Sequence, residues 1–466
     1  MLTFKSVTQQ DGSKLRSYYK DCTYGLCEYS VGTKLMWRTV LHPEWAESDG
    51  CLIVKNHIDG RYVFDYPVAG PEGDEESALQ TIESYCIENG FPLVISVVPE
   101  SKAPVLLSRY PYSKVSNIRT WRDYIYNAED LQNFVGRKYG GQRNHIKKFQ
   151  RSYPNAIFRP LTESDLPAVE VFWKSFEIEF GKTDYRAERE LAFAKKMLRL
   201  IKKPWFLAGG IFDGERLVAL SLAERCGSTL IIHIEKALYS YEGVYPTLVQ
   251  GFAQHFGSGI KCINREDDAA DRGLRISKLQ YEPVKLAPKY FFEPQNELLC
   301  HVKEIPLLET KRLSLSAITE EDIPAYNELV LDTERNRWWG YDDVSGLGKP
   351  VENSSFYDVA KKDFRHCSAV NFAVRLDGRM IGEAVLYRFN YRGDAELGCR
   401  ISKEYSGSGY GAEAFSAVAD WALYRVHLNR VVAKCYKENE ASYKMLSSCM
   451  KKCGEDETFF YFEKYV

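Results

Sequence analysis

The chain has 466 residues, of which 45% are hydrophobic and 27% are charged, and its formal net charge is −2 at pH 7. This length exceeds what one hydrophobic core supports, so we expect about two to four globular domains. The balanced charge excludes a bulk electrostatic attraction to nucleic acid, and no apolar run approaches the ~18–20 residues of a membrane span.

The cysteines and the first residues indicate a reducing compartment. The 12 cysteines include no C-x-x-C pair, so we expect buried free thiols. Cys449 and Cys453 lack the histidine or second pair that a zinc site needs, and we predict no metal. Residues 1–5 lead into no long apolar segment, so we predict no secretory signal and a cytoplasmic protein.

The first predicted element is a hairpin. Apolar runs at 51–54 and 62–64 flank Asp59-Gly60, and Asp-Gly between apolar runs is a strong signal for a tight hairpin turn. A helix is predicted over 75–88. We assign these elements to a first module, 1–130, that is a partial or divergent copy of the modules behind it.

A basic stretch opens the second module. It contains no acidic residue and consists of Arg137, Lys138, Arg143, Lys147, Lys148 and Arg151. Such a run suits the acceptor end of a tRNA or an anionic headgroup. It is also typical of a solvated helix face, so both interpretations stay open.

An internal repeat organises the rest of the chain. Residues 161–168 resemble 318–325, and Thr162 and Thr319 are the predicted N-caps of the helices that follow. Each copy is followed by an Asp-Gly hairpin signal, at 213–214 and at 377–378.

The spacing of the two copies is about 160 residues, which is too long for a solenoid and predicts duplicated domains. We place the second module at 131–300 and the third at 301–466. Each copy runs strand, helix, antiparallel strands, loop with helix, strand and helix. This order predicts a mixed α/β sheet with helices on both faces.

An acidic run follows in the second module, formed by Glu266, Asp267, Asp268 and Asp271. These carboxylates would suit a hard cation, but capping and surface charge are the commoner roles of such residues.

The segments 263–268, 273–275, 278–279 and 281–283, together with the basic stretch, resemble the uncharacterised family related to the C-terminal domain of phosphatidylglycerol lysyltransferases. The resemblance covers most of residues 1–294. It implies a tandem of acetyltransferase-like modules, some of whose relatives move aminoacyl groups from tRNA.

The most informative stretch is the glycine-rich turn at 406–411, between a strand-like run at 396–401 and a helix-like run at 412–427. Glycine permits positive φ angles and a close approach of a ligand to the backbone. Backbone N–H groups at a helix N-terminus attract anions, so the turn predicts a phosphate or pyrophosphate site.

Four pieces of the last module, 308–313, 395–398, 407–414 and 439–442, resemble the GNAT family of N-acetyltransferases, in its ribosomal-protein-acetyltransferase-like branch. The family's loop normally begins with Gln or Arg, where this chain has Ser406. The resemblance covers about 307–466. It implies a mixed α/β fold, and the whole chain is then three acetyltransferase-like modules in tandem.

The resemblance also implies acetyl-CoA as co-substrate. Its predicted pyrophosphate ligands are Gly407, Ser408, Gly409, Tyr410, Gly411 and Ala412. Asn439 would contact the pantetheine part, or would only cap the next helix. In the middle module Tyr241, Gly243 and Tyr245 stand opposite the three glycines, so we expect no backbone anion site there.

The strand at 395–401 carries the predicted general base. Period-two alternation places Glu396, Gly398 and Arg400 on one face, and the family places an acidic residue at Glu396. Glu396 would accept the proton of the amine, directly or through water. The alternative is that Glu396 only pairs with Arg400 at the sheet surface.

The general acid is expected near the start of the helix that follows Asn439. Many acetyltransferases have a tyrosine seven residues after the asparagine, where this chain has Leu446. Ser442 or Tyr443 is predicted to protonate the leaving thiolate instead. Both residues can also simply pack or cap the helix. Cys399 and Cys435 lie in strand patterns and are expected to be core thiols.

The family's acceptor side is the early helical region. The predicted substrate-binding residues there are Trp338, Trp339, Tyr341 and Asp342. Aromatic walls with carboxylates suit a cationic amine, although clustered aromatics are also common as core or loop anchors.

Three functions follow. The first is an acetyl-CoA-dependent N-acetyltransferase that acts on a small-molecule or peptide amine. The second is an aminoacyl-tRNA-dependent transferase carried by 1–294. The third gives the front modules a binding or scaffold role, with only 301–466 catalytic.

Overall fold

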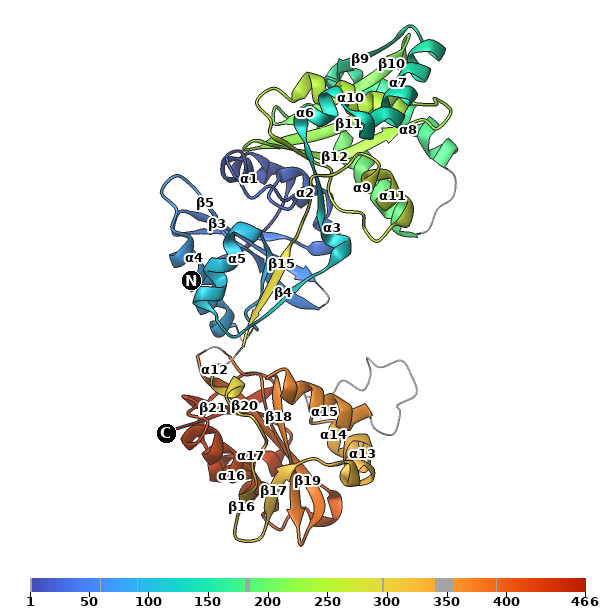
Figure 1. Cartoon of the computed structure of the whole chain (residues 1–466). Helices are drawn as coiled ribbons and strands as arrows, with labels where there is room; N and C mark the ends of the chain where they lie inside the picture. Colours follow the sequence, from blue (N-terminus) through green and yellow to red (C-terminus); the bar gives the residue numbers. More distant parts are fainter. Residues whose placement is uncertain are drawn as a thin grey trace. The chain divides into compact units, whose positions relative to one another are not determined.

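The computed structural model describes residues 2–466 except Asp59, Gly90, 181–184, Asn296, 340–354 and Tyr391. The chain forms two compact units, one of residues 1–109 with 115–293 and the other of 110–114 with 294–466. Figure 1 shows the helices and strands of each unit.

The first unit holds two mixed sheets. The first sheet has the order β1-β2-β3-β4-β6-β15-β7, and β5 pairs with β3. Its strands are β1 (Lys5–Ser6), β2 (Glu44–Ser48), β3 (Cys51–Ile58), β4 (Arg61–Asp65), β5 (Val68–Ala69), β6 (Ile95–Val98), β7 (Ser113–Asn117) and β15 (Tyr290–Pro294). The helices of this part are α1 (Gly12–Tyr19), α2 (Val31–Met36), α3 (Arg38–Leu41), α4 (Glu75–Glu88) and α5 (Ala103–Arg109). The predicted hairpin is β3–β4, and the predicted helix is α4.

The second sheet has the order β14-β8-β13-β12-β11-β10-β9. Its strands are β8 (Asp123–Asn127), β9 (Ala156–Pro160), β10 (Phe206–Asp213), β11 (Arg216–Cys226), β12 (Thr229–Ala237), β13 (Cys262–Asn264) and β14 (Lys285–Ala287). The helices are α6 (Ala128–Asn133), α7 (Gly140–Ser152), α8 (Leu166–Phe180), α9 (Tyr185–Leu198), α10 (Val244–Phe256) and α11 (Arg272–Leu279). One parallel pair, β12 with β13, lies among antiparallel neighbours.

The two sheets of the first unit exchange strands. β8 follows β7 in the chain but pairs with β13 and β14, and β15 follows β14 but pairs with β6. The chain therefore passes between the sheets twice, which ties both modules into one compact unit. β8 lies inside the predicted first module, 1–130, so the modules share strands; the boundaries themselves stay a prediction.

The second unit holds the third mixed sheet, in the order β16-β17-β18-β19-β20-β21-β23-β22. Its strands are β16 (Leu308–Glu309), β17 (Ser314–Ala317), β18 (Ala369–Leu376), β19 (Arg379–Tyr387), β20 (Asp394–Ile401), β21 (Arg430–Tyr436), β22 (Lys451–Glu455) and β23 (Phe459–Tyr465). The helices are α12 (Glu297–Cys300), α13 (Ile323–Leu331), α14 (Thr333–Asn336), α15 (Ser355–Arg365), α16 (Tyr410–Tyr424) and α17 (Glu440–Cys449). The predicted mixed α/β fold is confirmed.

Local chemistry explains the repeat seen in the sequence. Thr162 with Asp165, and Thr319 with Asp322, form the same capping box, in which each side chain bonds the other's backbone N–H. At the hairpin turn between β18 and β19, Asp377 has a φ of 51° and Gly378 a φ of 82°, as a tight primed turn requires.

The core of the second unit forms where α16 packs on the sheet. One face of this helix is apolar and is buried through Phe415, Val418, Ala419 and Ala422. Each fully buried large apolar side chain stabilises the fold by about 1.5–3 kcal/mol, so this face fixes the helix and the turn that precedes it. Within the described part of the chain, no helix is both long and apolar enough to cross a membrane.

Candidate active site

The glycine-rich turn lies between β20 and α16, as predicted. Gly407 and Gly409 each have a φ of 82°, and Gly409 is the N-cap of α16. A Cβ on Gly407 would meet no atom within 4 Å, so the backbone conformation selects glycine there. A Cβ on Gly411 would lie 3.2 Å from the Met445 sulfur, so glycine there serves packing of α16 on α17. The first-turn N–H groups of α16 have no carbonyl partner within the helix, so they can bind an anion.

The only parallel strand pair described in this unit is β20 with β21, and the turn follows β20 in the chain. β20 and β21 pair over 394–396 and 430–432, although β20 continues to Ile401 and β21 to Tyr436. Glu396 is the last residue of β20 in this pairing. Glu396, the predicted base, therefore lies at the point where the parallel pairing of β20 with β21 ends.

Glu396 has both carboxylate oxygens engaged. The Tyr387 hydroxyl donates to Oε1 at 2.7 Å, and Arg388 Nη1 donates to Oε2 at 2.8 Å. The Glu396 side chain is 12% exposed, whereas that of Arg388 is 56% exposed. Burial and the charge of Glu396 raise the pKa of Tyr387, so this hydroxyl stays a donor at neutral pH.

Arg400 does not pair with Glu396, so that alternative is wrong. Its Nε and Nη2 donate to Glu383 Oε2 at 3.0 and 2.8 Å. Tyr326 and Asn371 each donate to the other oxygen of Glu383 at 2.8 Å. Glu383 is completely buried, and four hydrogen bonds offset the cost of burying its charge.

Trp338 and Trp339 lie over the sheet face that carries the predicted base. A Cβ on Gly398 would lie 3.0 Å from Trp339, and the Arg400 guanidinium is 4.5 Å from the centroid of the same ring. The ring of Trp338 lies 5.4 Å from that of Tyr436. Both tryptophan side chains therefore cover part of this sheet face. The other predicted acceptor residues lie outside the described part of the chain: Tyr341 and Asp342.

The start of α17 has the capping geometry that the sequence allowed. Asn439 Oδ1 accepts the backbone N–H of Ser442 at 3.1 Å. The ring of Tyr443 packs 4.8 Å from Phe460 and 5.8 Å from Phe462. Asn439 thus caps the helix; its contact with a coenzyme and the acid roles of Ser442 and Tyr443 stay predictions.

Cys399 in β20 and Cys435 in β21 are in unreactive surroundings. Burial raises the pKa of Cys399 to about 12, and it also raises the pKa of Cys435. Because the thiolate is the nucleophilic form, these residues act as core thiols, as expected.

Tyr387 and Arg388 were not predicted. Tyr387 lies directly opposite Glu396 in the antiparallel pair of β19 and β20. The connection between these strands is longer than a two-residue turn, so the sequence did not specify the register.

The middle module differs at the corresponding turn. Gly243 is the N-cap of α10 with a φ of 84°, close to that of Gly409. A Cβ on Gly243 would lie 2.3 Å from the His145 carbonyl oxygen and 3.2 Å from the Phe149 Cβ. Helix α7 therefore packs against the N-terminus of α10 in the middle module.

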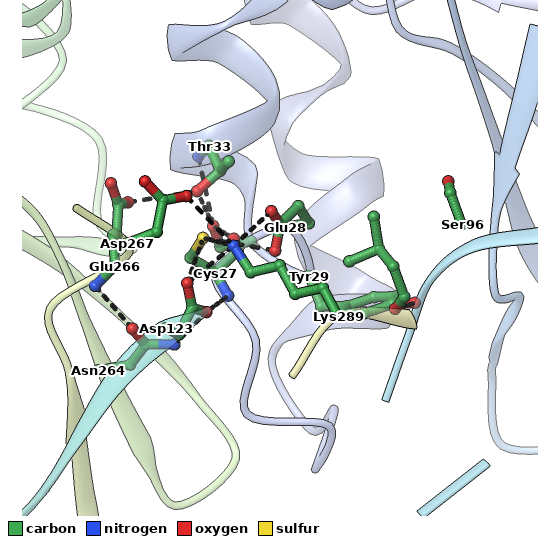
Figure 2. A network of polar contacts seen from close by, with 12 residues as sticks. Cys27, Glu28, Tyr29, Thr33, Ser96, Asp123, Asn264, Glu266, Asp267 and Lys289 are labelled. Carbon is green, nitrogen blue, oxygen red and sulfur yellow. Dashed lines mark hydrogen bonds and ion pairs between the residues drawn. The ribbon is translucent and has the colours of Figure 1, made fainter. Parts of the chain in front are cut away.

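A second cluster of titratable groups lies in the first unit and is centred on Lys289 (Figure 2). Its side chain is completely buried, and its Nζ lies 2.6 Å from Glu28, 2.8 Å from Asp123 and 3.5 Å from Asp267. The Cys27 sulfur is 3.3 Å from the same nitrogen. Lys289 and Asp123 lie at the two crossings between the sheets, so the cluster joins the exchanged strands.

Ligand atoms of Cys27, Glu28 and Asp123 lie within 4.8 Å of one another, a spacing that also suits a metal. The Lys289 ammonium contacts all three, so these residues fit an internal cation rather than a metal ion. Burial raises the pKa of Glu28 to about 7 although Lys289 lowers it, and the surrounding acids raise the pKa of Lys289 despite its burial. Sequence reasoning missed Lys289 and Asp123, because neither residue belongs to a local sequence motif.

A buried histidine lies between two acids in the same unit. His233 Nδ1 is 2.9 Å from Glu266, and Nε2 is 3.7 Å from Glu224. Burial lowers the pKa of His233, but the two carboxylates outweigh it and raise the pKa to about 9. A Cβ on Gly32 would lie 2.2 Å from Nε2, so the ring packs directly against α2.

The charged runs of the second module have structural partners. Asp268 accepts from Arg275 at 2.9 and 3.1 Å, and Asp271 caps α11. Lys148 pairs with Glu242 at 2.6 Å. These contacts support the capping and helix-face interpretations of both runs.

Comparison with known proteins places these features in families. Residues 22–293, more than half of the chain, match the family described as "Phosphatidylglycerol lysyltransferase, C-terminal". Residues 312–452 match the "Acetyltransferase (GNAT) domain".

Individual relatives agree with this division. YnaD, an uncharacterized N-acetyltransferase of Bacillus subtilis, is 27% identical over 149 residues, which are 32% of this chain and 81% of that protein. YoaA, another from the same bacterium, is 26% identical over 30% of this chain and 80% of that protein. A conserved protein of unknown function from Bacteroides thetaiotaomicron has the same fold, with a TM-score of 0.54 at 24% identity, over 63% of this chain and 99% of that one. Both predicted resemblances and the acyltransferase class are confirmed.

Proposed function

The chain belongs to the phosphatidylglycerol lysyltransferase C-terminal family and carries a GNAT acetyltransferase domain behind that region, and from this premise we propose that it is an acetyl-CoA-dependent N-acetyltransferase. The acetyl group passes directly from the thioester to a primary amine. One observation carries the proposal: a turn with two positive-φ glycines at the N-terminus of α16 follows the strand that bears Glu396.

In the proposed reaction the turn from Gly407 to Ala412 binds the coenzyme pyrophosphate, and Asn439 contacts the pantetheine. The amine nitrogen attacks the thioester carbonyl carbon, the C–S bond breaks, and CoA leaves as a thiol. Glu396 takes the proton of the amine, directly or through water. Ser442 or Tyr443 supplies the proton to the thiolate.

The proposed base can exchange one of its partners for the incoming amine. Tyr387 is buried, whereas Arg388 is more than half exposed, so Arg388 is the partner that an incoming ammonium can displace from Glu396 Oε2. Exchange of one cation for another keeps the carboxylate paired throughout. Trp338 and Trp339, and by prediction Tyr341 and Asp342, would flank this acceptor.

Coenzyme binding is tested by adding charge to the turn without backbone strain. Ser408 is exposed and has no positive φ, so Ser408→Glu places a carboxylate beside the predicted phosphate site. Ser258→Glu is the matched control at an exposed serine of the first unit. Calorimetry should show acetyl-CoA binding for wild type and the control and none for Ser408→Glu. Equal affinity in all three proteins would refute the coenzyme site.

Glu396→Gln tests the base. Loss of a general base typically lowers kcat about 10²–10⁴-fold. The deficit should shrink at high pH, where the amine loses its proton unaided. Steady-state rates against a panel of amines, from pH 6.5 to 9.5, measure both effects, and a wild-type rate would leave Glu396 as a structural partner of Tyr387.

An aminoacyl-tRNA-dependent transfer is the second candidate. The family match over 22–293 favours this candidate, because the description of the family names a lysyltransferase. If the first unit carries this activity, aminoacyl transfer from charged tRNA persists in Ser408→Glu. If only acetyl transfer is observed and that variant abolishes it, the front modules have a binding or scaffold role.

A further inference from the structure

The glycine-rich turn is held by a contact from a distant part of the chain. Arg312 lies between β16 and β17, and its Nη1 donates to the Ser408 carbonyl oxygen at 2.9 Å. Its Nε and Nη2 both lie 2.7 Å from Glu413 Oε2 in the first turn of α16. One guanidinium therefore joins the middle of the turn to the helix that follows it.

Two further groups complete this contact. The Arg312 backbone N–H donates to Glu413 Oε1 at 2.8 Å, and the Thr310 hydroxyl donates to the same oxygen at 2.7 Å. The guanidinium also lies 4.5 Å from the centroid of the Tyr410 ring. Burial would raise the pKa of Glu413, but the bonds from Thr310 and Arg312 lower it, so Glu413 is ionised at neutral pH.

We propose that Arg312 is a positioning residue for coenzyme binding, which acts by fixing the Ser408–Gly409 peptide and by neutralising Glu413. This inference rests on the proposed function. It assigns a role to Arg312, which the sequence marked only as part of a family resemblance.

The orientation of one peptide follows from the bond to Ser408. A trans peptide is planar, and its C=O and N–H point in opposite directions. Because Arg312 holds the Ser408 carbonyl, the N–H of Gly409 must point away from Arg312. This N–H immediately precedes the first turn of α16, so the bond pre-orients a donor at the helix N-terminus.

Neutralisation of Glu413 is the second effect. A carboxylate in the first turn of a helix stabilises the helix dipole, but it repels a phosphate that binds at the same terminus. The paired guanidinium cancels this charge. Glu413 can therefore anchor the turn without weakening the anion site.

The test measures acetyl-CoA affinity by calorimetry and steady-state constants with the full chain. Arg312→Ala should weaken acetyl-CoA binding about 10- to 100-fold, the scale of a lost charge-assisted pair. KM for acetyl-CoA should rise while kcat at saturation stays within about twofold, because the lost interaction binds ground state and transition state alike. With S-acetylpantetheine, which has no phosphates, the variant and wild type should have equal kcat/KM.

Arg375→Ala is the matched control. Arg375 pairs with Asp322 through two contacts of 2.6 Å each in the same unit, at the start of α13. This variant should lower the melting temperature of the unit and leave the affinity for acetyl-CoA unchanged. Two further variants, one conservative and one compensating, guard against misfolding. Arg312→Lys should bind acetyl-CoA more weakly than wild type, because an ammonium cannot bridge Ser408 and Glu413. Glu413→Gln in the Arg312→Ala background should recover part of the affinity.

The outcomes separate the two proposals. If wild type binds no acetyl-CoA, the proposed function and this inference fail together. If wild type binds but Arg312→Ala binds equally well, only the inference fails. An equal loss with S-acetylpantetheine, or the same loss in Arg375→Ala, also overturns it, because either result reveals a general structural effect.

Discussion

Removal of the Lys289 ammonium tests the buried cluster of the first unit. In Lys289→Ala, three carboxylates that lie within 2.6–3.5 Å of Nζ lose their shared cation. Breaking a buried ion pair by deleting one partner costs about 3–5 kcal/mol. Because about 1 kcal/mol shifts the midpoint by about 2 °C in a unit of this size, the midpoint should fall by about 6–10 °C.

Lys285→Ala provides a close control. Lys285 is four residues earlier and pairs with Glu100, but both side chains are half exposed, at 50% and 55%. Exposed pairs contribute about 0–1 kcal/mol, so this variant should lose at most about 2 °C.

The assay is differential scanning calorimetry of the full chain at pH 8 and pH 5. In Lys289→Ala the pKa values of the unpaired acids rise, so proton uptake replaces the missing cation as pH falls. The deficit at pH 5 should therefore be smaller than at pH 8. Equal losses for the two lysine variants, or equal deficits at both pH values, would refute this account of the cluster.

Two more predictions concern buried sites of the first unit. His233 has a pKa of about 9 against its ordinary 6.5, so its stabilisation is complete below pH 6.5 and is lost as pH rises to 9. Thermal unfolding should show a loss of about 3 kcal/mol over this range in wild type and little in His233→Gln; the same slope in both proteins would contradict this. Gly243→Ala should destabilise the first unit by more than the ~1–2 kcal/mol strain that Gly407→Ala causes in the second. The reason is that its Cβ also meets the His145 carbonyl at 2.3 Å, whereas Gly407 has open space, and equal losses in calorimetry would contradict it.

Features that depend on neighbouring residues could be predicted from the sequence. The capping boxes at Thr162 and Thr319 and the hairpin turn at Asp377-Gly378 use groups within three residues of one another. The turn predicted to bind an anion is equally local, because two glycines adopt positive φ just before a helix. Family resemblance supplied Glu396 as the expected base, and this role stays a prediction.

Partners from distant parts of the chain could not be predicted. The sequence offered Arg400 as the partner of Glu396, but Arg388 and Tyr387 bind it because of the register between β19 and β20. The sequence also did not predict in which sheet β8 and β15 pair, since the local pattern of each strand is compatible with either sheet.

The sequence by itself therefore determined the mixed α/β fold class and the turn that suits a phosphate, since these depend on short-range backbone preferences and periodicity. Only the tertiary structure decided how that turn is held and which charges are paired. Arg312 and Glu413 are 101 residues apart, and Lys289 and Cys27 are 262 apart. Contacts over such separations form only when packing of the core brings the strands together, so no local pattern encodes them.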